Sequence, residues 1–486
     1  MSPELDTLRS ALLQLEEEMR NSPTRYASLL SAVHPSQLES AKNLLNYLIL
    51  RKTDIQELQE SLHEEGLSSL ASCESHVYRQ IQVTLSRLGE EVRPLDPCSM
   101  EFGSKKIQKN SERLFGLHHA EWPSSVMVTF DRSFFDEKKY VEKLLQNGMG
   151  VARINCAHDD PNTWTQMVRE IQRACKKTGL SCAIHFDLAG PKIRTVLLQK
   201  GRESGKAEIK VGGRVWLSDS AKGFTQKEVV VSPNEPGLIQ SLKVGERIYF
   251  DDGLIRARVE RITKKGAALK IERISSKKPF LKNEKGINFP DSVLAISSLT
   301  DFDRKCLPLV IKLADTVGFS FVRTPEDLAD LRSEMLKLTA TPPPVILKIE
   351  TRDAVVQLPG LLLESMKEPC FGVMIARGDL AVEIGFERLV EVQEEISWIC
   401  EAGHVPVIWA TQVLENLHKS GIASRAEITD AGRAAMAECV MINKGEHTLE
   451  VLKTLKDIAK RSRALKVKNR LIFRPLRIAE SFLENN

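Results

Sequence analysis

Hydrophobic and polar residues follow two different rhythms along the chain, and the change comes near residue 124. Before it, apolar residues recur at the spacing of a helix face. The clearest run is Leu5, Leu8, Leu12, Leu15 and Met19. We predict an N-terminal helical region over residues 1–95, with no chemistry of its own, and a linker with Pro, Gly, Lys, Asn and Ser over 96–123.

From Ser124 onward, short apolar runs alternate with amphipathic segments of helix length. Eight runs have the length of strands: Val126–Phe130, Val151–Asn155, Cys182–Asp187, Val317–Val322, Val345–Glu350, Gly372–Ala376, Val405–Thr411 and Val440–Asn443. The segments between and after them are Glu137–Gln146, Thr163–Lys177, Asp301–Leu313, Pro325–Leu338, Ala354–Ser365, Leu389–Ala402 and Leu449–Arg461. Eight such units predict an α/β fold, a closed (β/α)8 TIM barrel. The pattern alone leaves an open doubly wound sheet as the alternative.

About a hundred residues interrupt the barrel after its third strand, and their signatures are those of strands and turns. We predict a small β-barrel lid domain over 196–285, inserted between barrel parts 124–195 and 286–466, with a C-terminal tail over 467–486. Residues 192–285 carry 22 Lys and Arg against 11 Asp and Glu. Such an excess suits a lid over a polyphosphate, and it also suits a solvated basic surface.

Composition sets limits on the function. The net charge of +4 over 486 residues gives no reason to expect nucleic acid or a membrane surface, and no apolar run approaches the ~20 residues of a membrane span. The nine cysteines form no Cys-x-x-Cys pair, which argues against a zinc site and a secreted disulfide scaffold. We expect a cytoplasmic protein, because the acidic start resembles neither a signal nor a transit peptide. A plastid or other organelle stays open if a transit peptide was removed.

Six of the eight predicted strands end in polar residues, at the end where a TIM barrel carries its active site. These residues are Arg153 and Asn155, Asp187, Lys348 and Glu350, Arg377 to Asp379, Thr411 and Gln412, and Asn443 to Glu446. Side chains two apart on a strand face the same way, so Lys348 and Glu350 project together. The carboxylates of Glu350 and Asp379 suit Mg²⁺, while Lys348 and Arg153 suit a phosphate and a developing oxyanion. The alternative is a set of buried salt bridges at the barrel rim.

These residues lie in motifs that together resemble the pyruvate kinase family. In chain order the motifs are Val151-Ala-Arg-Ile-Asn155 with His158, Asp187-Leu-Ala-Gly-Pro-Lys-Ile-Arg-Thr195, Phe250-Asp-Asp-Gly-Leu-Ile255, Lys285-Gly-Ile-Asn-Phe-Pro290, Lys348-Ile-Glu350, Ala376-Arg-Gly-Asp-Leu380, Ala410-Thr-Gln412 and Ser424-Arg-Ala-Glu427. The resemblance covers roughly residues 124–465. Each motif alone is weak, but eight in order, with a lid-sized insert in the matching loop, are specific.

The resemblance implies a glycolytic kinase that transfers a phosphoryl group from phosphoenolpyruvate to ADP, with Mg²⁺, to give pyruvate and ATP. It implies that Arg153 binds the transferred phosphate and that Lys348 stabilises the enolate oxygen. By the same resemblance, Gly378 and Asp379 contact substrate and Thr411 lies where the enolate is protonated. The remaining implied roles are Glu350 and Asp379 as Mg²⁺ ligands, Arg194 and His158 at the nucleotide, and Asn155 and Asp187 at a monovalent cation.

The chain departs from the family on the nucleotide and monovalent-cation side. Thr129 to Ser133 stands where the family has a Gly-Pro-Ala-Ser turn, and Asn443-Lys-Gly-Glu446 stands where it has Leu-Ser-Gly-Glu. Ala157, Leu188 and Lys192 replace residues of potassium-dependent members, so we expect Lys192 to supply the missing charge and the enzyme to work without K⁺. We expect no counterpart of the family's usual C-terminal domain, and hence a homodimer through the barrel and no classical effector control.

Two other functions fit parts of the pattern. A catalytically weak relative could act as a ligand-binding or interaction protein, and the altered nucleotide turn favours it. A barrel lyase that uses a magnesium-bound enolate needs the same carboxylates but no nucleotide lid. The lid motif Asp251-Asp-Gly-Leu-Ile255 therefore counts against the lyase.

Overall fold

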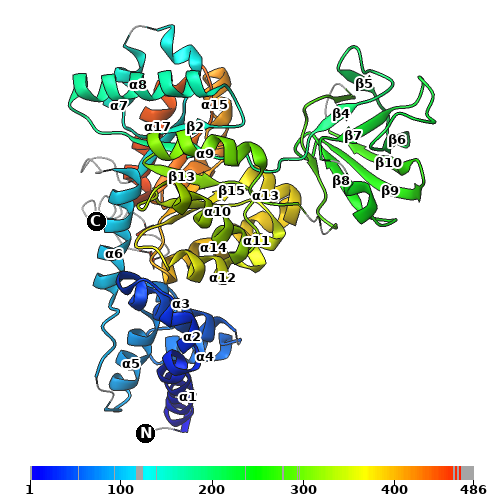
Figure 1. Cartoon of the computed structure of the whole chain (residues 1–486). Helices are drawn as coiled ribbons and strands as arrows, with labels where there is room; N and C mark the ends of the chain where they lie inside the picture. Colours follow the sequence, from blue (N-terminus) through cyan, green and yellow to red (C-terminus); the bar gives the residue numbers. More distant parts are fainter. Residues whose placement is uncertain are drawn as a thin grey trace, which may run out of the picture.

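The computed structural model describes residues 3–463 except 53, 92–93, 117–123, 138, 236, 276–278, 293 and 295, and the backbone of a short hairpin, β18 (Lys466–Val467) and β19 (Arg470–Leu471). The predicted tail over 467–486 lies mostly outside these residues. Figure 1 shows three parts: N-terminal helices in blue, a central barrel, and a β domain in green to one side of it.

The barrel is closed by eight parallel strands in the order β1-β17-β16-β15-β14-β13-β3-β2. They are β1 (Ser125–Thr129), β2 (Met149–Asn155), β3 (Ala183–Asp187), β13 (Thr316–Phe319), β14 (Val345–Ile349), β15 (Gly372–Ala376), β16 (Val407–Ala410) and β17 (Cys439–Ile442). The barrel closes where β1 pairs with β17, with Ser125 opposite Cys439. The predicted TIM barrel is confirmed, and each predicted strand run overlaps one of these strands.

Helices surround the barrel at nearly the predicted places. They are α7 (Tyr140–Gln146), α8 (Pro161–Thr178), α9 (Asp301–Leu313), α10 (Pro325–Leu338), α11 (Arg352–Val356), α12 (Leu358–Ser365), α13 (Arg377–Ile384), α14 (Leu389–Ala402), α15 (Glu415–Ser420), α16 (Arg425–Ala434) and α17 (Thr448–Arg463). Residues 354–365 were predicted as one helix and form two. The break precedes Pro359, which has no N–H to donate and whose ring crowds the carbonyl of Val355.

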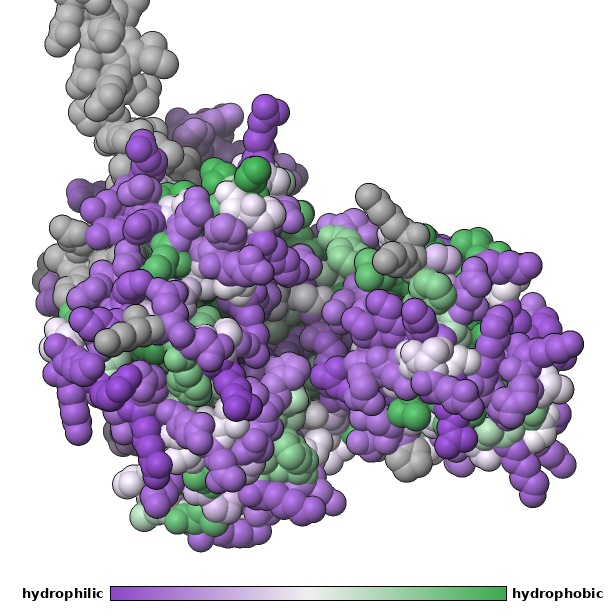
Figure 2. Space-filling model, turned by 90° about the horizontal axis from the view of Figure 1, so that it is seen from above, coloured by the Kyte–Doolittle hydropathy of each residue, from purple (hydrophilic) through white to green (hydrophobic). Residues whose placement is uncertain are grey.

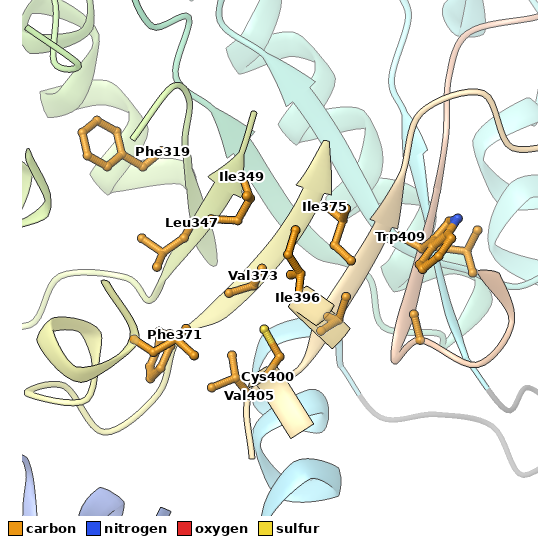
Figure 3. Close-up of a cluster of buried hydrophobic side chains, with 14 of the residues drawn as sticks. Phe319, Leu347, Ile349, Phe371, Val373, Ile375, Ile396, Cys400, Val405 and Trp409 are labelled. Atoms are coloured by element: carbon orange, nitrogen blue, oxygen red, sulfur yellow. The ribbon is translucent and has the colours of Figure 1, made fainter. Parts of the chain in front are cut away.

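The main hydrophobic core lies between the strands and the surrounding helices. In Figure 3, Leu347, Ile349, Val373 and Ile375 from β14 and β15 face Ile396 of α14, and all five are less than 1% exposed. The opposite side of each strand fills the barrel interior with residues such as Met127, Val151, Ile346, Met374 and Ile408. Alternating strand residues thus serve two apolar layers, as TIM barrels require.

The predicted linker is wrong where helix α6 (Met100–Phe115) runs through it. Ser99 caps the helix by accepting a hydrogen bond from the Phe102 N–H. Its last residues, Leu114 and Phe115, are buried in the same cluster as Met127 and Val151 of the barrel interior. Helix α6 therefore closes the end of the barrel opposite the predicted site. Only a few apolar residues of α6 make this contact, which is why its sequence reads as polar.

The N-terminal helices pack directly on the barrel. They are α1 (Pro3–Arg25), α2 (Ala27–Ser31), α3 (Leu38–Arg51), α4 (Gln56–Glu64) and α5 (Val77–Arg87), and their buried residues belong to the main core. His404, which follows α14 and is fully buried, connects the barrel to the N-terminal helices. Its Nδ1 lies 2.9 Å from Ser40 Oγ, and its Nε2 lies 2.9 Å from the Ser75 carbonyl oxygen. Within the part of the chain that the structure describes, no helix combines the length and apolar character needed to cross a bilayer.

The inserted β domain has a sheet of seven strands in the order β12-β8-β9-β10-β6-β7-β4. These strands are β4 (Thr195–Leu197), β6 (Arg214–Leu217), β7 (Val230–Pro233), β8 (Arg247–Phe250), β9 (Ile255–Thr263), β10 (Gly266–Ile274) and β12 (Ile287–Asn288), while β5 (Lys206–Glu208) pairs with β11 (Phe280–Lys282). The domain has a hydrophobic core of its own. Its outer surface is largely hydrophilic, and a hollow separates it from the barrel (Figure 2).

Candidate active site

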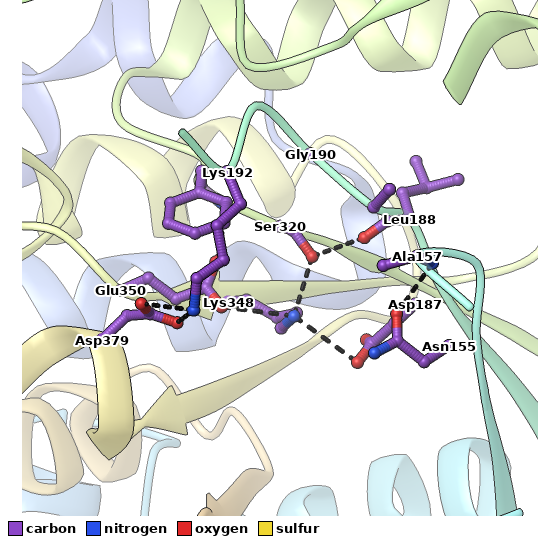
Figure 4. A network of polar contacts seen from close by, with 12 residues as sticks. Asn155, Ala157, Asp187, Leu188, Gly190, Lys192, Ser320, Lys348, Glu350 and Asp379 are labelled. Atoms are coloured by element: carbon purple, nitrogen blue, oxygen red, sulfur yellow. Dashed lines mark hydrogen bonds and ion pairs between the residues drawn. The ribbon is translucent and has the colours of Figure 1, made fainter. Parts of the chain in front are cut away.

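The predicted site residues meet at one end of the barrel because parallel strands end together there. Asn155 of β2 pairs in register with Asp187 of β3, and Arg153 pairs with His185. Lys348 lies near the end of β14, Asp379 lies in the first turn of α13, and Thr411 follows β16. Figure 4 shows Lys348, Glu350 and Asp379 on one side of the mouth, with Asp187 and Asn155 on the other.

Asp187 is the centre of this arrangement and has no solvent exposure. Its Oδ2 lies 2.6 Å from Nε of Arg153 and 3.4 Å from Nζ of Lys348. Its Oδ1 lies 2.8 Å from Nε2 of His185. Burial alone would raise the pKa of this carboxyl, but the charges of Arg153 and Lys348 outweigh burial and hold the pKa well below its usual range. Asp187 is therefore ionised, and it fixes two cations in the mouth.

Lys348 is held on three sides. Besides Asp187, its Nζ donates to Ser320 Oγ at 2.7 Å and lies 3.2 Å from Oε1 of Glu350. The other oxygen of Glu350 accepts a hydrogen bond from the Phe321 N–H at 2.5 Å. Burial raises the pKa of Glu350, Lys348 lowers it, and Asp379 raises it again. The two carboxylates are thus close enough to repel each other, which favours a cation between them.

Asp379 is paired with Lys192, whose Nζ lies 2.9 and 3.2 Å from the two carboxylate oxygens. The same Nζ lies 3.5 Å from Asp252 of the β domain, so Lys192 links the domain to the barrel. Sequence reasoning expected this ammonium beside Asn155 and Asp187. The structure places it on Asp379 instead, and Figure 4 shows the Lys192 side chain extending to that carboxylate.

The carboxylates of Glu350 and Asp379 fit a magnesium site. Mg²⁺ takes one or two protein carboxylates and completes its octahedron with water and substrate oxygens. Among the described residues, no three His, Cys, Asp or Glu side chains are grouped to hold a metal, so a metal held wholly by such groups does not fit here. A two-carboxylate site that shares its ion with a substrate does fit.

Thr411 combines backbone strain with an unsatisfied polar atom. Its φ is +68°, a value that threonine rarely adopts, and its buried Oγ1 has no hydrogen-bond partner within the described chain. Arg377 fixes the loop through hydrogen bonds to the carbonyls of Ala410 and Thr411, at 3.1 and 2.6 Å. Asp430 in turn holds Arg377 at 2.5 and 2.9 Å. The strained loop therefore places Thr411 beside a cavity of about 480 Å³, which Asp379, Asn443 and Asp252 also line.

The other predicted side of the mouth is rich in cations. Burial lowers the pKa of His158, and the nearby charges of Lys444 and Arg194 lower it further. Arg194 donates to the Glu284 carbonyl at 3.0 Å, whereas Lys444 forms a 2.8 Å ion pair with Asp131. This pair joins two stretches that depart from the family motifs, since Asp131 lies in the altered turn after β1 and Lys444 in the altered stretch after β17. Asn155 accepts a hydrogen bond from the Ala157 N–H at 3.0 Å.

Comparison with known proteins agrees with this geometry. A family model described as the barrel domain of pyruvate kinase matches residues 125–449. The chain belongs to the pyruvate kinase family. The pyruvate kinase of Thermotoga maritima is 34% identical over 332 residues, which cover 67% of this chain and 68% of that protein. Those of Geobacillus stearothermophilus and Staphylococcus saprophyticus are 32% and 30% identical, over 66% and 72% of this chain.

The match to the last two pyruvate kinases covers 54% and 59% of their length. The chain therefore spans little more than half of these relatives. What is shared is the barrel with its inserted domain, and the roles of individual residues depend on the geometry described above.

Sequence reasoning missed three residues of the site and one ion pair. Ser320 follows β13 directly, whereas the predicted apolar run extended to Val322 and placed Ser320 inside the strand. His185 lies two residues before Asp187 on β3, so the spacing rule applied to Lys348 and Glu350 could have found it. Asp430 lies inside helix α16, and its sequence position carried no such signal. The pairing of Lys444 with Asp131 joins residues 313 positions apart, and only the closure of the barrel brings them together.

Proposed function

We propose that the protein transfers a phosphoryl group from phosphoenolpyruvate to ADP, with Mg²⁺, giving pyruvate and ATP as a step of glycolysis. The observation that carries the proposal is the buried Asp187, which holds Arg153 and Lys348 beside the two carboxylates Glu350 and Asp379. Two fixed cations next to a magnesium-type site, beside an inserted domain, suit an anionic phosphate donor.

Each residue has a part in this reaction. Arg153 and Lys348 bind the phosphate of the donor and neutralise charge on its oxygens as the phosphoryl group leaves. A magnesium ion on Glu350 and Asp379 would draw charge from the phosphate and enolate oxygens. Lys348 stabilises the enolate oxygen that remains, and the hydroxyl of Thr411 guides a proton, through water, to the enolate carbon.

On the acceptor side, we assign Arg194 and His158 to the phosphates of the nucleotide. We also propose that the reaction needs no added K⁺. Lys192 supplies a positive charge from within the chain, beside Asp379, and both oxygens of Asp187 are already bound by His185, Arg153 and Lys348. A coupled assay with and without KCl tests this, and a strong K⁺ requirement contradicts it.

The assay for the main proposal follows pyruvate release from phosphoenolpyruvate and each nucleoside diphosphate, with Mg²⁺ present or chelated. Lys348→Met should abolish turnover, because it removes the cation at the reacting oxygens. Lys337→Met is the matched control, since that lysine lies on the surface and pairs only with Glu334 among the described contacts. Equal turnover by Lys348→Met and the native chain would refute the assignment.

A catalytically weak relative that binds phosphoenolpyruvate or a nucleotide is the second candidate. The Lys444–Asp131 ion pair favours it, because the pair occupies the side assigned to the acceptor. Calorimetric binding of phosphoenolpyruvate without turnover on any nucleoside diphosphate would favour this second function.

We propose a cytoplasmic location and a homodimer formed through the barrel. The support for the dimer is exposed apolar side chains on the outside of the barrel: Val390 of α14 is 70% exposed, and Ile422, in the loop between α15 and α16, is 75% exposed. Light scattering on the purified chain measures the assembly, and a monomer at micromolar concentration would contradict it.

A further inference from the structure

His185 lies inside the barrel between two polar groups and is fully buried. Its Nδ1 lies 2.9 Å from Oγ1 of Thr316, and its Nε2 lies 2.8 Å from Oδ1 of Asp187. Because an ionised carboxylate only accepts hydrogen bonds, Nε2 carries the proton of this contact. The imidazole therefore connects the neighbouring strand β13 to the carboxylate at the centre of the site.

The space for this contact depends on a glycine. A Cβ atom at Gly318 would lie 2.0 Å from Oδ1 of Asp187 and 2.8 Å from Nε2 of His185. Gly318 is opposite Asp187 in the β3–β13 pairing, and Thr316 is opposite His185. Strand β13 thus leaves one position without a side chain, and the imidazole–carboxylate pair fills the space.

The contact divides the two oxygens of Asp187 between different partners. Oδ1 accepts a hydrogen bond from Nε2 of His185. Oδ2 lies 2.6 Å from Nε of Arg153 and 3.4 Å from Nζ of Lys348. Without His185, Oδ1 would be a buried acceptor that has lost its donor, which is costly for a charged group. Rotation of the carboxylate toward Arg153 or Lys348 would satisfy that oxygen, and it would displace both cations.

We propose that His185 is a positioning residue for the phosphoryl donor: through Asp187 it sets the places of the Arg153 guanidinium and the Lys348 ammonium. The inference rests on the proposed function, because it assumes that these two cations bind phosphoenolpyruvate. His185 itself touches no reacting atom. Its loss should therefore weaken use of the donor and leave use of the acceptor nearly unchanged.

The test measures KM for phosphoenolpyruvate and for ADP separately, together with direct calorimetric binding of phosphoenolpyruvate in the presence of Mg²⁺. His185→Leu removes the donor group, and His185→Asn keeps a polar side chain too short to reach Asp187. Both should raise the dissociation constant and the KM for phosphoenolpyruvate by about 10- to 100-fold, the range for a lost hydrogen bond to a charged group. His185→Gln, whose amide can reach Oδ1, should recover most of the loss.

A matched control removes a buried polar contact elsewhere in the barrel. Ser124→Ala deletes a hydroxyl that donates to the Ala435 carbonyl at 2.9 Å and should change neither KM. Unchanged donor binding in folded His185→Asn, or equal rises in both KM values, would overturn the inference, and the asparagine variant decides the question if the leucine variant does not fold. If the native chain neither binds nor converts phosphoenolpyruvate, the proposed function itself fails, and the inference falls with it.

Discussion

Glu383 of α13 provides a quantitative test of how burial affects a carboxyl where the barrel contacts the inserted domain. Asn288 of β12 donates to its Oε1 at 3.1 Å. Burial raises the pKa of Glu383 from 4.5 to about 7; the hydrogen bond from Asn288 opposes this, and the charges of Asp379, Asp353 and Asp291 add to it. The pKa of Glu383 is higher in the folded chain than in the unfolded chain, so the folded state is stabilised by the protonated carboxyl. This contribution to the free energy of unfolding is fully present below pH ~4.5 and is lost as the pH rises through ~7.

The size of the loss follows from the difference between about 7 and 4.5, or about 2.5 pH units. At about 1.4 kcal/mol for each unit, ionised Glu383 lowers the free energy of unfolding by about 3–4 kcal/mol above neutral pH. Glu383→Gln keeps the shape and cannot ionise, so the variant should be more stable than the native chain at pH 8 and nearly equal to it at pH 4.5.

Thermal unfolding of the two chains between pH 4.5 and 8 measures this difference. Glu387→Gln, at an exposed glutamate four residues further along, is the control and should follow the native chain. Parallel curves for Glu383→Gln and the native chain across this range would refute the argument that burial holds the carboxyl protonated.

Three further predictions concern other parts of the molecule. Leu114→Ala should destabilise the barrel by about 2–5 kcal/mol, because a fully buried side chain leaves a cavity; an unchanged melting temperature would contradict the closing role of α6. Arg377→Lys should lower kcat more than it raises KM for the donor, because one ammonium cannot replace the bonds that fix the Thr411 loop. Lys444→Ala should change KM for ADP but not for phosphoenolpyruvate, and the reverse pattern would place Lys444 on the donor side.

The barrel could be predicted from the sequence because each of its strands is a short apolar run between helix-length segments. β14 shows why this works: Val345 to Ile349 is apolar except for Lys348, and the polar residue points into the mouth. The rule that parallel strands end together then brings Lys348, Glu350 and Asp187 to one site without further information. These predictions needed only local pattern and one property of the fold.

The rest depended on contacts between distant segments. Helix α6 was missed because it buries only a few apolar residues, and their partners lie in strands that follow it in the chain. Lys192 was placed beside Asn155 because sequence position gives no direction for a long side chain after a turn, and the nearest strong charge, on Asp379, decides where its ammonium lies. The role of His185 could not be predicted, since it depends on the space that Gly318 leaves on the neighbouring strand.

The charges of the mouth give a physical reason for a metal in the proposed reaction. Three cationic side chains of the mouth form ion pairs with three carboxylates, so the formal charges of these six groups sum to zero. The cations are Arg153, Lys192 and Lys348, and the carboxylates are Asp187, Glu350 and Asp379. Phosphoenolpyruvate brings a carboxylate and a phosphate into this balanced set, so its binding needs positive charge from outside the set. A divalent cation on Glu350 and Asp379 supplies that charge where the oxygens arrive, and it can do so only if Lys192 shares or releases Asp379. The link from Lys192 to Asp252 means that this release also changes a contact of the inserted domain, so metal binding and the position of that domain should be coupled.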